Sequence, residues 1–362
     1  MTKQSRERRL GFKEFLLSLF LIVIVWAAGD LVGIGKRAEP TLEPDPGGVI
    51  EVFFTAPSGA SGAGKGGLDE RLVALIDGAA RSVDVAAFDF ELSDVADALV
   101  RASARDVRVR LVTDSDYAGE AGPVTLQAAG IPVVTDDRDP FMHNKFVIVD
   151  GYQVWTGSWN LTENGTNLHD NNVVFVQSTK LAANYAAEFE EMFADRAFGP
   201  TSPDNTPYPQ LDLNGTRVET IFEAEGDAEK RIVDLIREAE RSIHFMAFVM
   251  TDDDIARVLI AQHRAGLAVS GVMESRNTAD LGSDFPALRQ AGVDVLEDGN
   301  PYLLHHKTLI VDEAIVVTGS YNFSASAADN NDENVLIIHS PEIARAYMDE
   351  FARVYAVAAA QD

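Results

Sequence analysis

Two stretches of the chain align with each other without a gap: MHNKFVIVDGYQVWTGSWNLTENGTNLHDNNVVFV (142–176) and LHHKTLIVDEAIVVTGSYNFSASAADNNDENVLII (304–338). Both follow the pattern H-x-K-x4-D-x6-G-S-x-N. The apolar run after each Lys is typical of a buried strand, and the later Gly-Ser marks a tight turn. The residues that this pattern doubles are His143 and His305, Lys145 and Lys307, Asp150 and Asp312, Ser158 and Ser320, and Asn160 and Asn322.

The repetition extends to the sequence before these stretches. RLVALIDGAARSVDVAAFDF (71–90) matches RIVDLIREAERSIHFMAFVM (231–250), and each reads as an amphipathic helix followed by a buried strand. We therefore expect an α/β fold of two repeated α/β/α domains with mixed sheets, packed about a pseudo-two-fold axis. The predicted domains span 48–198 and 214–362, joined by a proline-rich linker at 199–213.

Composition limits the class of protein. The 362 residues are 46% hydrophobic, which excludes a disordered chain, and the 57 acidic residues against 30 basic ones give a net charge of −27. Such an acidic surface repels phosphate backbones, so the chain is not expected to coat nucleic acid non-specifically. The absence of cysteine excludes disulfides, thiolate catalysis and cysteine-based metal sites.

The N-terminal sequence has the features of an export signal. A basic start is followed by the uncharged run FLLSLFLIVIVWAAG (15–29). We expect residues 1–35 to be a signal or membrane anchor and residues 36–48 to be an extended tether. An anchor would place the body outside the cytoplasm at the cell membrane, and a cleaved signal would make the protein secreted.

The doubled motif contains the groups that phosphoryl chemistry needs. In an H-x-K strand the two side chains point to the same face, so two such strands supply two imidazoles and two ammonium groups to one pocket. The Asn after each turn adds an amide donor. This pocket suits a tetrahedral phosphoryl group, with one imidazole as nucleophile and the other as general acid. Because no acidic cluster of the kind that binds magnesium or calcium accompanies the motif, we expect metal-independent chemistry without a cofactor.

The doubled motif resembles the HKD signature of the phospholipase D superfamily, and the resemblance covers nearly all of residues 48–362. It implies a phosphodiesterase that works through a covalent phosphohistidine. One motif His attacks phosphorus, and the other protonates the leaving alcohol and then activates water. Because both halves of the site are in one chain, we expect a monomer. The resemblance implies that Lys145, Lys307, Asn160 and Asn322 bind the phosphoryl oxygens.

The remaining motif residues are expected to act as supports. We expect the two aspartates to end their strands rather than to take part in catalysis. The serines are expected to support the turn or the ligands. These supporting residues are Asp150, Asp312, Ser158 and Ser320.

The two halves differ at one position. The second half has Glu333 where the first has Asn171, and a carboxylate beside an imidazole fixes its tautomer and stabilises its cation. In related enzymes such partners reach across the two-fold axis, so we assign Glu333 to His143 as the nucleophile, with His305 as the acid. A partner in the same half would exchange the two roles, and Asp170 offers an alternative carboxylate after a small backbone shift.

Substrate is a separate question, since one fold serves several. We rank hydrolysis of phospholipid head groups first, because a membrane-proximal tether and apolar residues before each His (Phe141-Met142 and Tyr302-Leu303-Leu304) favour a lipid. An exported endonuclease is the second hypothesis, since GSYNFSASAADNNDENVLI (319–337) resembles the small exported bacterial endonucleases of the superfamily and their mitochondrial relatives. An inactive binding module is the third, and the completeness of both motifs counts against it.

Overall fold

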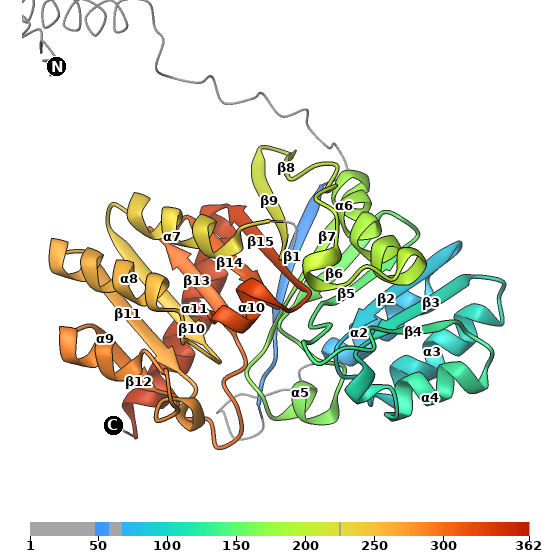
Figure 1. Ribbon diagram of the computed structural model, residues 1–362, viewed down its shortest axis with the longest axis horizontal. Helices are drawn as coiled ribbons and strands as arrows, with labels where there is room; N and C mark the ends of the chain where they lie inside the picture. The colour runs from blue at the N-terminus through green and yellow to red at the C-terminus, as the bar shows by residue number, and fades with distance from the viewer. Residues whose placement is uncertain (1–47, 58–66, 224–225, 362) are drawn as a thin grey trace, which may run out of the picture. The chain divides into compact units, whose positions relative to one another are not determined.

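A computed structural model describes residues 48–57, 67–223 and 226–361. The predicted signal or anchor and the tether up to residue 47 lie outside the described residues. The described part of the chain contains no helix that has both the length and the apolar character to cross a bilayer. The described residues belong to one compact unit, in which the first lobe is blue to green and the second is yellow to red in Figure 1.

The first lobe contains a seven-stranded mixed sheet with the order β1-β7-β6-β5-β2-β3-β4. β2, β3 and β4 are parallel, and the other neighbours are antiparallel. The strands are β1 (Val49–Phe54), β2 (Ser82–Ala87), β3 (Arg108–Thr113), β4 (Val133–Thr135), β5 (Lys145–Val149), β6 (Gln153–Gly157) and β7 (Asn172–Gln177). The helices are α2 (Leu68–Asp77), α3 (Ser93–Ser103), α4 (Ala121–Ala128), α5 (Glu163–Asn167) and α6 (Thr179–Glu190), with short turns at Ser115–Tyr117, Glu191–Asp195 and Gly199–Thr201.

The second lobe repeats this arrangement in an eight-stranded sheet with the order β12-β11-β10-β13-β14-β15-β9-β8. The strands are β8 (Gln210–Leu213), β9 (Thr216–Glu223), β10 (Ser242–Ala247), β11 (Ala268–Met273), β12 (Asp294–Glu297), β13 (Lys307–Val311), β14 (Ile315–Gly319) and β15 (Glu333–His339). The helices are α7 (Ala228–Glu238), α8 (Asp253–Ala265), α9 (Phe285–Ala291), α10 (Ala325–Asp329) and α11 (Pro341–Ala359), with a short turn at Ser275–Asn277.

The two orders match strand for strand, which confirms the mixed sheets and the repeated fold expected from the sequence. β8 has no counterpart in the described part of the first lobe. It corrects one expectation, because the last four residues of the predicted linker are a strand that pairs with β9 rather than an irregular connection. The pattern LDL (211–213) alternates apolar and polar residues, but it is too short to be separated from the preceding prolines by sequence alone.

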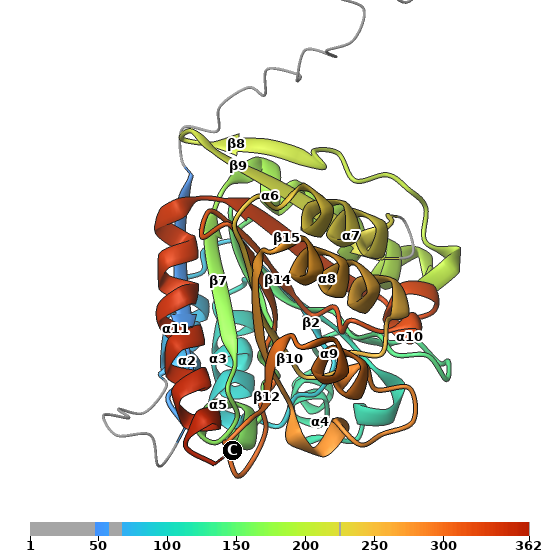
Figure 2. The ribbon, with the colours of Figure 1, turned by 90° about the vertical axis from the view of Figure 1, so that its left-hand side faces the viewer.

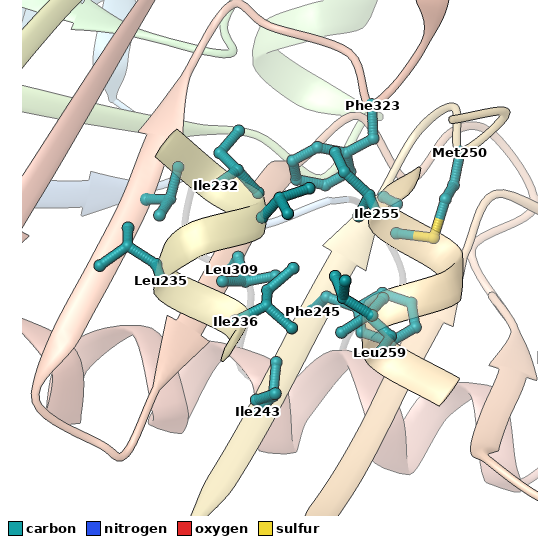
Figure 3. Packing of buried hydrophobic residues seen from close by; sticks show 14 of the residues in the cluster. Ile232, Leu235, Ile236, Ile243, Phe245, Met250, Ile255, Leu259, Leu309 and Phe323 are labelled. Carbon is teal, nitrogen blue, oxygen red and sulfur yellow. The ribbon is translucent and has the colours of Figure 1, made fainter. Parts of the chain in front are cut away.

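Helices cover both faces of each sheet because the strands bury side chains on both faces. In the second lobe, Ile243 and Phe245 of β10 point towards α7 and α8 (Figure 3), whereas Met246 packs against α11 on the opposite face. Figure 2 shows α11 on the other side of the strands from α7 and α8. In the first lobe, α2, α3 and α4 cover one face and α6 the other. This pattern follows from the period of two in side-chain direction along a strand.

The lobes share their inner cores. The α6 side of the first sheet forms one apolar cluster with Leu336 and Ile338 of β15, and the α11 side of the second sheet receives Val52 and Phe54 of β1. Each sheet therefore contributes to burying the other, and the strand ends that carry the doubled motif are fixed relative to each other by a common apolar interior.

The helices that follow the motif begin at paired capping residues. Ser178 and Ser340 accept a backbone N–H at the starts of α6 and α11, and Thr162 and Ser324 do the same at α5 and α10. A side-chain oxygen at this position satisfies one of the otherwise unpaired N–H groups of the first turn. The same capping chemistry in both lobes explains why the two motifs lead into helices at the same spacing.

Candidate active site

The two motif aspartates lie at the far ends of the strands from the histidines. Asp150 follows β5 and accepts the backbone N–H groups of residues 80–82, the closest being that of Arg81 at 2.7 Å. Asp312 follows β13 and binds residues 240–242 in the same way. Each Asp lies seven residues after its motif His, so the two ends of this extended segment are roughly 23 Å apart. Both aspartates thus anchor the connection into β2 or β10 and take no place in the site.

His143 is held by the second lobe. Its backbone N–H donates to the carbonyl oxygen of Asp332 at 3.0 Å, and its Nδ1 lies 2.8 Å from both carboxylate oxygens of Glu333. Glu333 is fully buried at the start of β15, where it also accepts from Ser320 Oγ at 2.6 Å and from Asn331 Nδ2 at 3.2 Å. The carboxylate is therefore oriented by other donors and pairs with the histidine of the opposite lobe. The pairing of Glu333 with His143 is thus the one across the lobes, and not the alternative in which Glu333 pairs with the histidine of its own half.

His305 has the equivalent contacts with an amide in place of the carboxylate. Its backbone N–H donates to Asp170 O at 2.9 Å, and its Nδ1 lies 2.9 Å from Asn171 Oδ1. Asn171 Oδ1 also accepts from Ser158 Oγ, while Nδ2 donates to Gly165 O, which fixes the orientation of the amide. Nδ1 of His305 therefore carries the hydrogen, and Nε2 is the nitrogen that remains for chemistry.

Each motif lysine contacts the backbone carbonyl of its own motif His and an aromatic ring. Lys145 Nζ donates to His143 O at 2.8 Å, and Lys307 Nζ donates to His305 O at 3.0 Å. Their ammonium groups lie over the rings of Phe88 and Phe248, 4.8 and 4.6 Å from the centroids. Each ring also meets the motif His of its lobe edge-on at 4.8 Å. These aromatic contacts fix the ammonium groups and the imidazoles in one arrangement.

Phe88 and Phe248 were missed by sequence reasoning. They occupy the same position of the aligned segments 71–90 and 231–250, so an identical aromatic residue in both copies was available as a signal. Their role could not be read from the pattern, because an aromatic residue at the end of a buried strand is normally part of the core.

The pKa values of the two motif histidines and the two motif lysines are all lowered. Burial lowers the pKa of His143 to about 4, although Glu333 acts to raise it. Burial also lowers the pKa of Lys145 to about 7 and holds those of His305 and Lys307 well below their usual values, with the neighbouring lysines adding to the effect. A bound anion would oppose these shifts, because its charge favours the protonated forms of the imidazoles and the lysines.

The Gly-Ser turns bring the serine and asparagine of the motif to the site. A Cβ atom on Gly157 would lie 2.3 Å from Asn172 O, and one on Gly319 would lie 2.1 Å from Asn334 O, so only glycine fits there. The serine hydroxyls bind the partners of the histidines, as given above, and thus act as supports. Asn160 lines a small pocket with Lys145 and Phe88. The buried Oδ1 atoms of Asn160 and Asn322 have no protein partner among the described residues.

The middle residue of each H-x-K sequence points away from the site, as expected for alternating strand positions. His306 is fully buried between Asn172 Oδ1 and Glu350 Oε1, both at 3.1 Å. Its counterpart Asn144 donates to Glu188 and accepts from Asn334 at 2.9 Å. These side chains join the two lobes behind the site. The aromatic residues after the two Gly-Ser turns, Trp159 and Tyr321, are buried beneath the turns.

The backbone carbonyl groups that hold the two histidines belong to aspartates whose own carboxylates are clamped. Asp170, which holds His305, is bound by Arg353 of α11 and by Asn300 Nδ2 at 2.9 Å. Asp332, which holds His143, accepts from Gly199 N at 2.6 Å and lies 3.6 Å from Arg138. Both clamps lie outside the doubled motif.

The Arg353 clamp yields a prediction. Arg353→Met leaves two buried carboxylates, those of Asp170 and Glu350, without their cation, so the free energy of unfolding should fall by about 3 kcal/mol or more. The turnover number should fall with it, because the His305 backbone loses a fixed acceptor. The matched control is Arg257→Met, which removes an exposed pair with Asp254 and should cost less than about 1 kcal/mol. Denaturant titration of both variants measures the difference, and equal losses would contradict a special role for Arg353.

No three His, Asp or Glu side chains converge as ligands for a metal ion within residues 48–57, 67–223 and 226–361. What the site does contain is two imidazoles, two ammonium groups and the side-chain amides of Asn160 and Asn322, whose NH2 groups can donate hydrogen bonds, drawn from both lobes. Such a group of donors fits a phosphodiester anion.

Comparison with known proteins gives the family. The model of the family described as "Cardiolipin synthase, PLD-like domain" matches residues 72–193 and again residues 232–355. The chain belongs to this PLD-like family. The two matches fall one in each lobe, so the family's domain is present twice. As a member of the phospholipase D superfamily, the protein is a phosphodiesterase, a hydrolase of phosphoric diesters.

Two curated relatives of this PLD-like protein each match a stretch of it about as long as one lobe. A phospholipase D of Rickettsia prowazekii is 31% identical over 163 residues, 45% of this chain and 80% of the relative. A mitochondrial cardiolipin hydrolase of Homo sapiens is 34% identical over 128 residues, 35% of this chain and 51% of the relative. The structure of a phosphatidylserine synthase from Haemophilus influenzae shares the fold across both lobes, with a TM-score of 0.63, 12% identity, and coverage of 83% of this chain and 86% of that one.

Proposed function

We propose that this protein hydrolyses the head-group phosphodiester of phospholipids through a covalent intermediate on His143. The observation that carries the proposal is the unequal pairing of the two histidines, a carboxylate on His143 and an amide on His305, around one anion-binding site. A carboxylate stabilises the cation that forms when an imidazole is phosphorylated. The names of the relatives, phospholipase D and cardiolipin hydrolase, support a lipid substrate.

In the first step, Nε2 of His143 attacks phosphorus, a P–N bond forms, and the P–O bond to the head-group alcohol breaks. The phosphoryl anion lies between the two lysines and the amides of Asn160 and Asn322. Its charge opposes the lowering of the His305 pKa, so Nε2 of His305 takes up a proton and donates it to the departing alkoxide. The products of this step are the free alcohol and phosphohistidine.

In the second step, His305, now neutral, removes a proton from water. The new P–O bond forms as the P–N bond breaks, which restores neutral His143 and releases phosphatidic acid. The sum is one phosphodiester and one water consumed, and one alcohol and one phosphomonoester formed. No step requires a metal ion, since the lysines meet the charge of the equatorial oxygens.

The proposal includes the setting of the enzyme. The basic start and the apolar run at 15–29 support an anchor that keeps the body close to a membrane. Both half-sites lie in one chain, which supports action as a monomer. The net charge of −27 is unfavourable for long polyanions such as nucleic acid.

The test is an assay of the full chain in detergent and EDTA. Phosphatidylcholine and cardiolipin vesicles are compared with single-stranded and duplex DNA. We expect release of head-group alcohol and phosphatidic acid from lipid, abolished in His143→Ala and retained in His263→Ala on α8. Cleavage of DNA alone would replace the lipid proposal by an endonuclease, and equal inactivity of the wild type and His143→Ala on every substrate would favour a binding module.

A further inference from the structure

Exposed apolar side chains gather at one end of the fold. The large hydrophobic residues that are exposed in the described part of the chain number six, and four of them lie on segments that lead away from the carboxyl ends of the parallel strands. Both histidines lie at this same end. We call these four residues the rim. They are Val124 (49% exposed), Phe141 (40%), Leu281 (104%) and Tyr302 (41%).

The rim draws on both lobes from equivalent places. Val124 lies in the first turn of α4, and Leu281 lies in the loop that leads into α9, the equivalent helix. Phe141 stands two residues before His143, and Tyr302 stands three residues before His305. Scattered exposed apolar residues need no explanation, but a set placed symmetrically about the site does.

The rim is continuous with the site in the first lobe. The ring of Phe141 lies 5.2 Å from that of Phe88, and Phe88 in turn lies 4.8 Å from the ring of His143. The ring of Tyr117 also packs against that of Phe88, at 4.6 Å. An apolar path therefore runs from the exposed edge of the molecule to the nucleophile.

The charged residues near the rim are mostly acidic, so the rim is not expected to bind anionic surfaces by electrostatic attraction. The exposed basic residue on these segments is Arg276, and it lies 3.8 Å from Glu274. The exposed acidic residues on the same segments are Asp116, Glu120, Asp137, Asp139 and Asp280. A negative rim repels anionic surfaces over a distance of about 10 Å at moderate salt, so contact must come from the apolar side chains.

We infer that the rim docks on the surface of a phospholipid bilayer by inserting its apolar side chains, without a requirement for anionic lipid. The inference rests on the proposed lipid substrate and names the surface on which the enzyme meets it. Docking through the rim brings the mouth of the site to the head groups, where the phosphodiester lies. The acidic residues between the apolar ones remain in water and favour zwitterionic over anionic bilayers.

The absence of cysteine makes insertion directly measurable. Leu281→Cys in the full chain is labelled with an environment-sensitive dye. The control is Arg264→Cys, labelled in the same way, at the C-terminal end of α8, which is the end away from the rim. With phosphatidylcholine vesicles we expect a blue shift and quenching by brominated lipid at position 281 and neither at 264, at both low and high salt. A signal at 281 that depends on protein concentration without vesicles would assign the rim to a second copy of the chain and overturn the inference. So would equal responses at the two positions.

Activity provides the second measurement. Leu281→Ser/Tyr302→Ser should lower the rate on phosphatidylcholine vesicles, relative to the rate on soluble bis(4-nitrophenyl) phosphate, about tenfold or more, since two apolar insertions are lost. An unchanged ratio in a wild type that does hydrolyse lipid would overturn the rim and leave the proposed function intact. A wild type that hydrolyses the soluble diester but no lipid, in vesicles or as short-chain micelles, would instead overturn the lipid substrate.

Discussion

His143→Ala should reduce phosphodiester hydrolysis at least about 10⁴-fold, because removing a nucleophile removes the entire covalent path. His305→Ala should be nearly as slow on a lipid, whose alcohol is a poor leaving group, but not on a diester of 4-nitrophenol. That leaving group departs without a proton, so His143 is still phosphorylated once and the variant then stalls.

The measurement is a rapid-mixing burst. The His305→Ala variant should release about one equivalent of nitrophenol and retain an acid-labile phosphoryl group on His143, and His143→Ala should show neither. His263→Ala, which alters a histidine of α8 outside the site, serves as the control for loss of an imidazole. A burst in His143→Ala in place of His305→Ala would reverse the two roles, which is the outcome that same-lobe pairing would have required.

Glu333→Gln should reduce turnover by up to about 10⁴, the loss found when the carboxylate partner of a catalytic histidine becomes an amide. The substitution keeps the size of the side chain and a hydrogen-bond acceptor for His143, but it removes the charge that stabilises phosphohistidine. Glu333 raises the pKa of His143 against the effect of burial, so in the variant the pKa of His143 should fall further below its usual value. We therefore expect His143 to be neutral at neutral pH in both proteins, and the loss of turnover should not depend on pH in that range.

The matched variant is Asn171→Asp, which gives His305 the partner that His143 has. Burial and the lysines hold the pKa of His305 well below its usual value. A carboxylate at 171 raises it, so the acid stays protonated to higher pH and the basic limb of the kcat profile moves upward. Profiles of both variants, measured on one lipid substrate, test the assignment. A basic limb that stays in place in Asn171→Asp would contradict His305 as the acid.

Much of the site could be predicted because the chain repeats itself. Residues that recur at one spacing, such as His143 and His305, stand out from a single sequence, and the strand and turn signals between them are local. Glu333 stood out because it breaks the repeat, whereas its assignment to His143 of the opposite lobe came from the resemblance to the phospholipase D superfamily and not from the repeat. Contacts that form only when the lobes pack were not accessible. The clamp of Arg353 on Asp170 joins residues 183 positions apart and belongs to no shared pattern.

The two aromatic residues that contact the motif lysines could not be predicted from the sequence pattern. Phe88 and Phe248 stand at strand ends where an apolar residue is expected for packing alone, and nothing in their spacing distinguishes a ring that faces an ammonium group. Strand β8 was missed for a different reason, because its pairing partner rather than its own sequence makes it a strand.

Each histidine is completed by a residue of the other lobe, and both lobes are one polypeptide. An active site divided between separate subunits is lost on dilution, because mass action favours the dissociated halves. Here the effective concentration of one half for the other is fixed by the peptide chain, so the specific activity should not depend on how sparsely the enzyme is distributed. The same linkage has freed each half from the need to match the other, and the carboxylate at 333 opposite the amide at 171 is a difference that identical subunits could not have acquired.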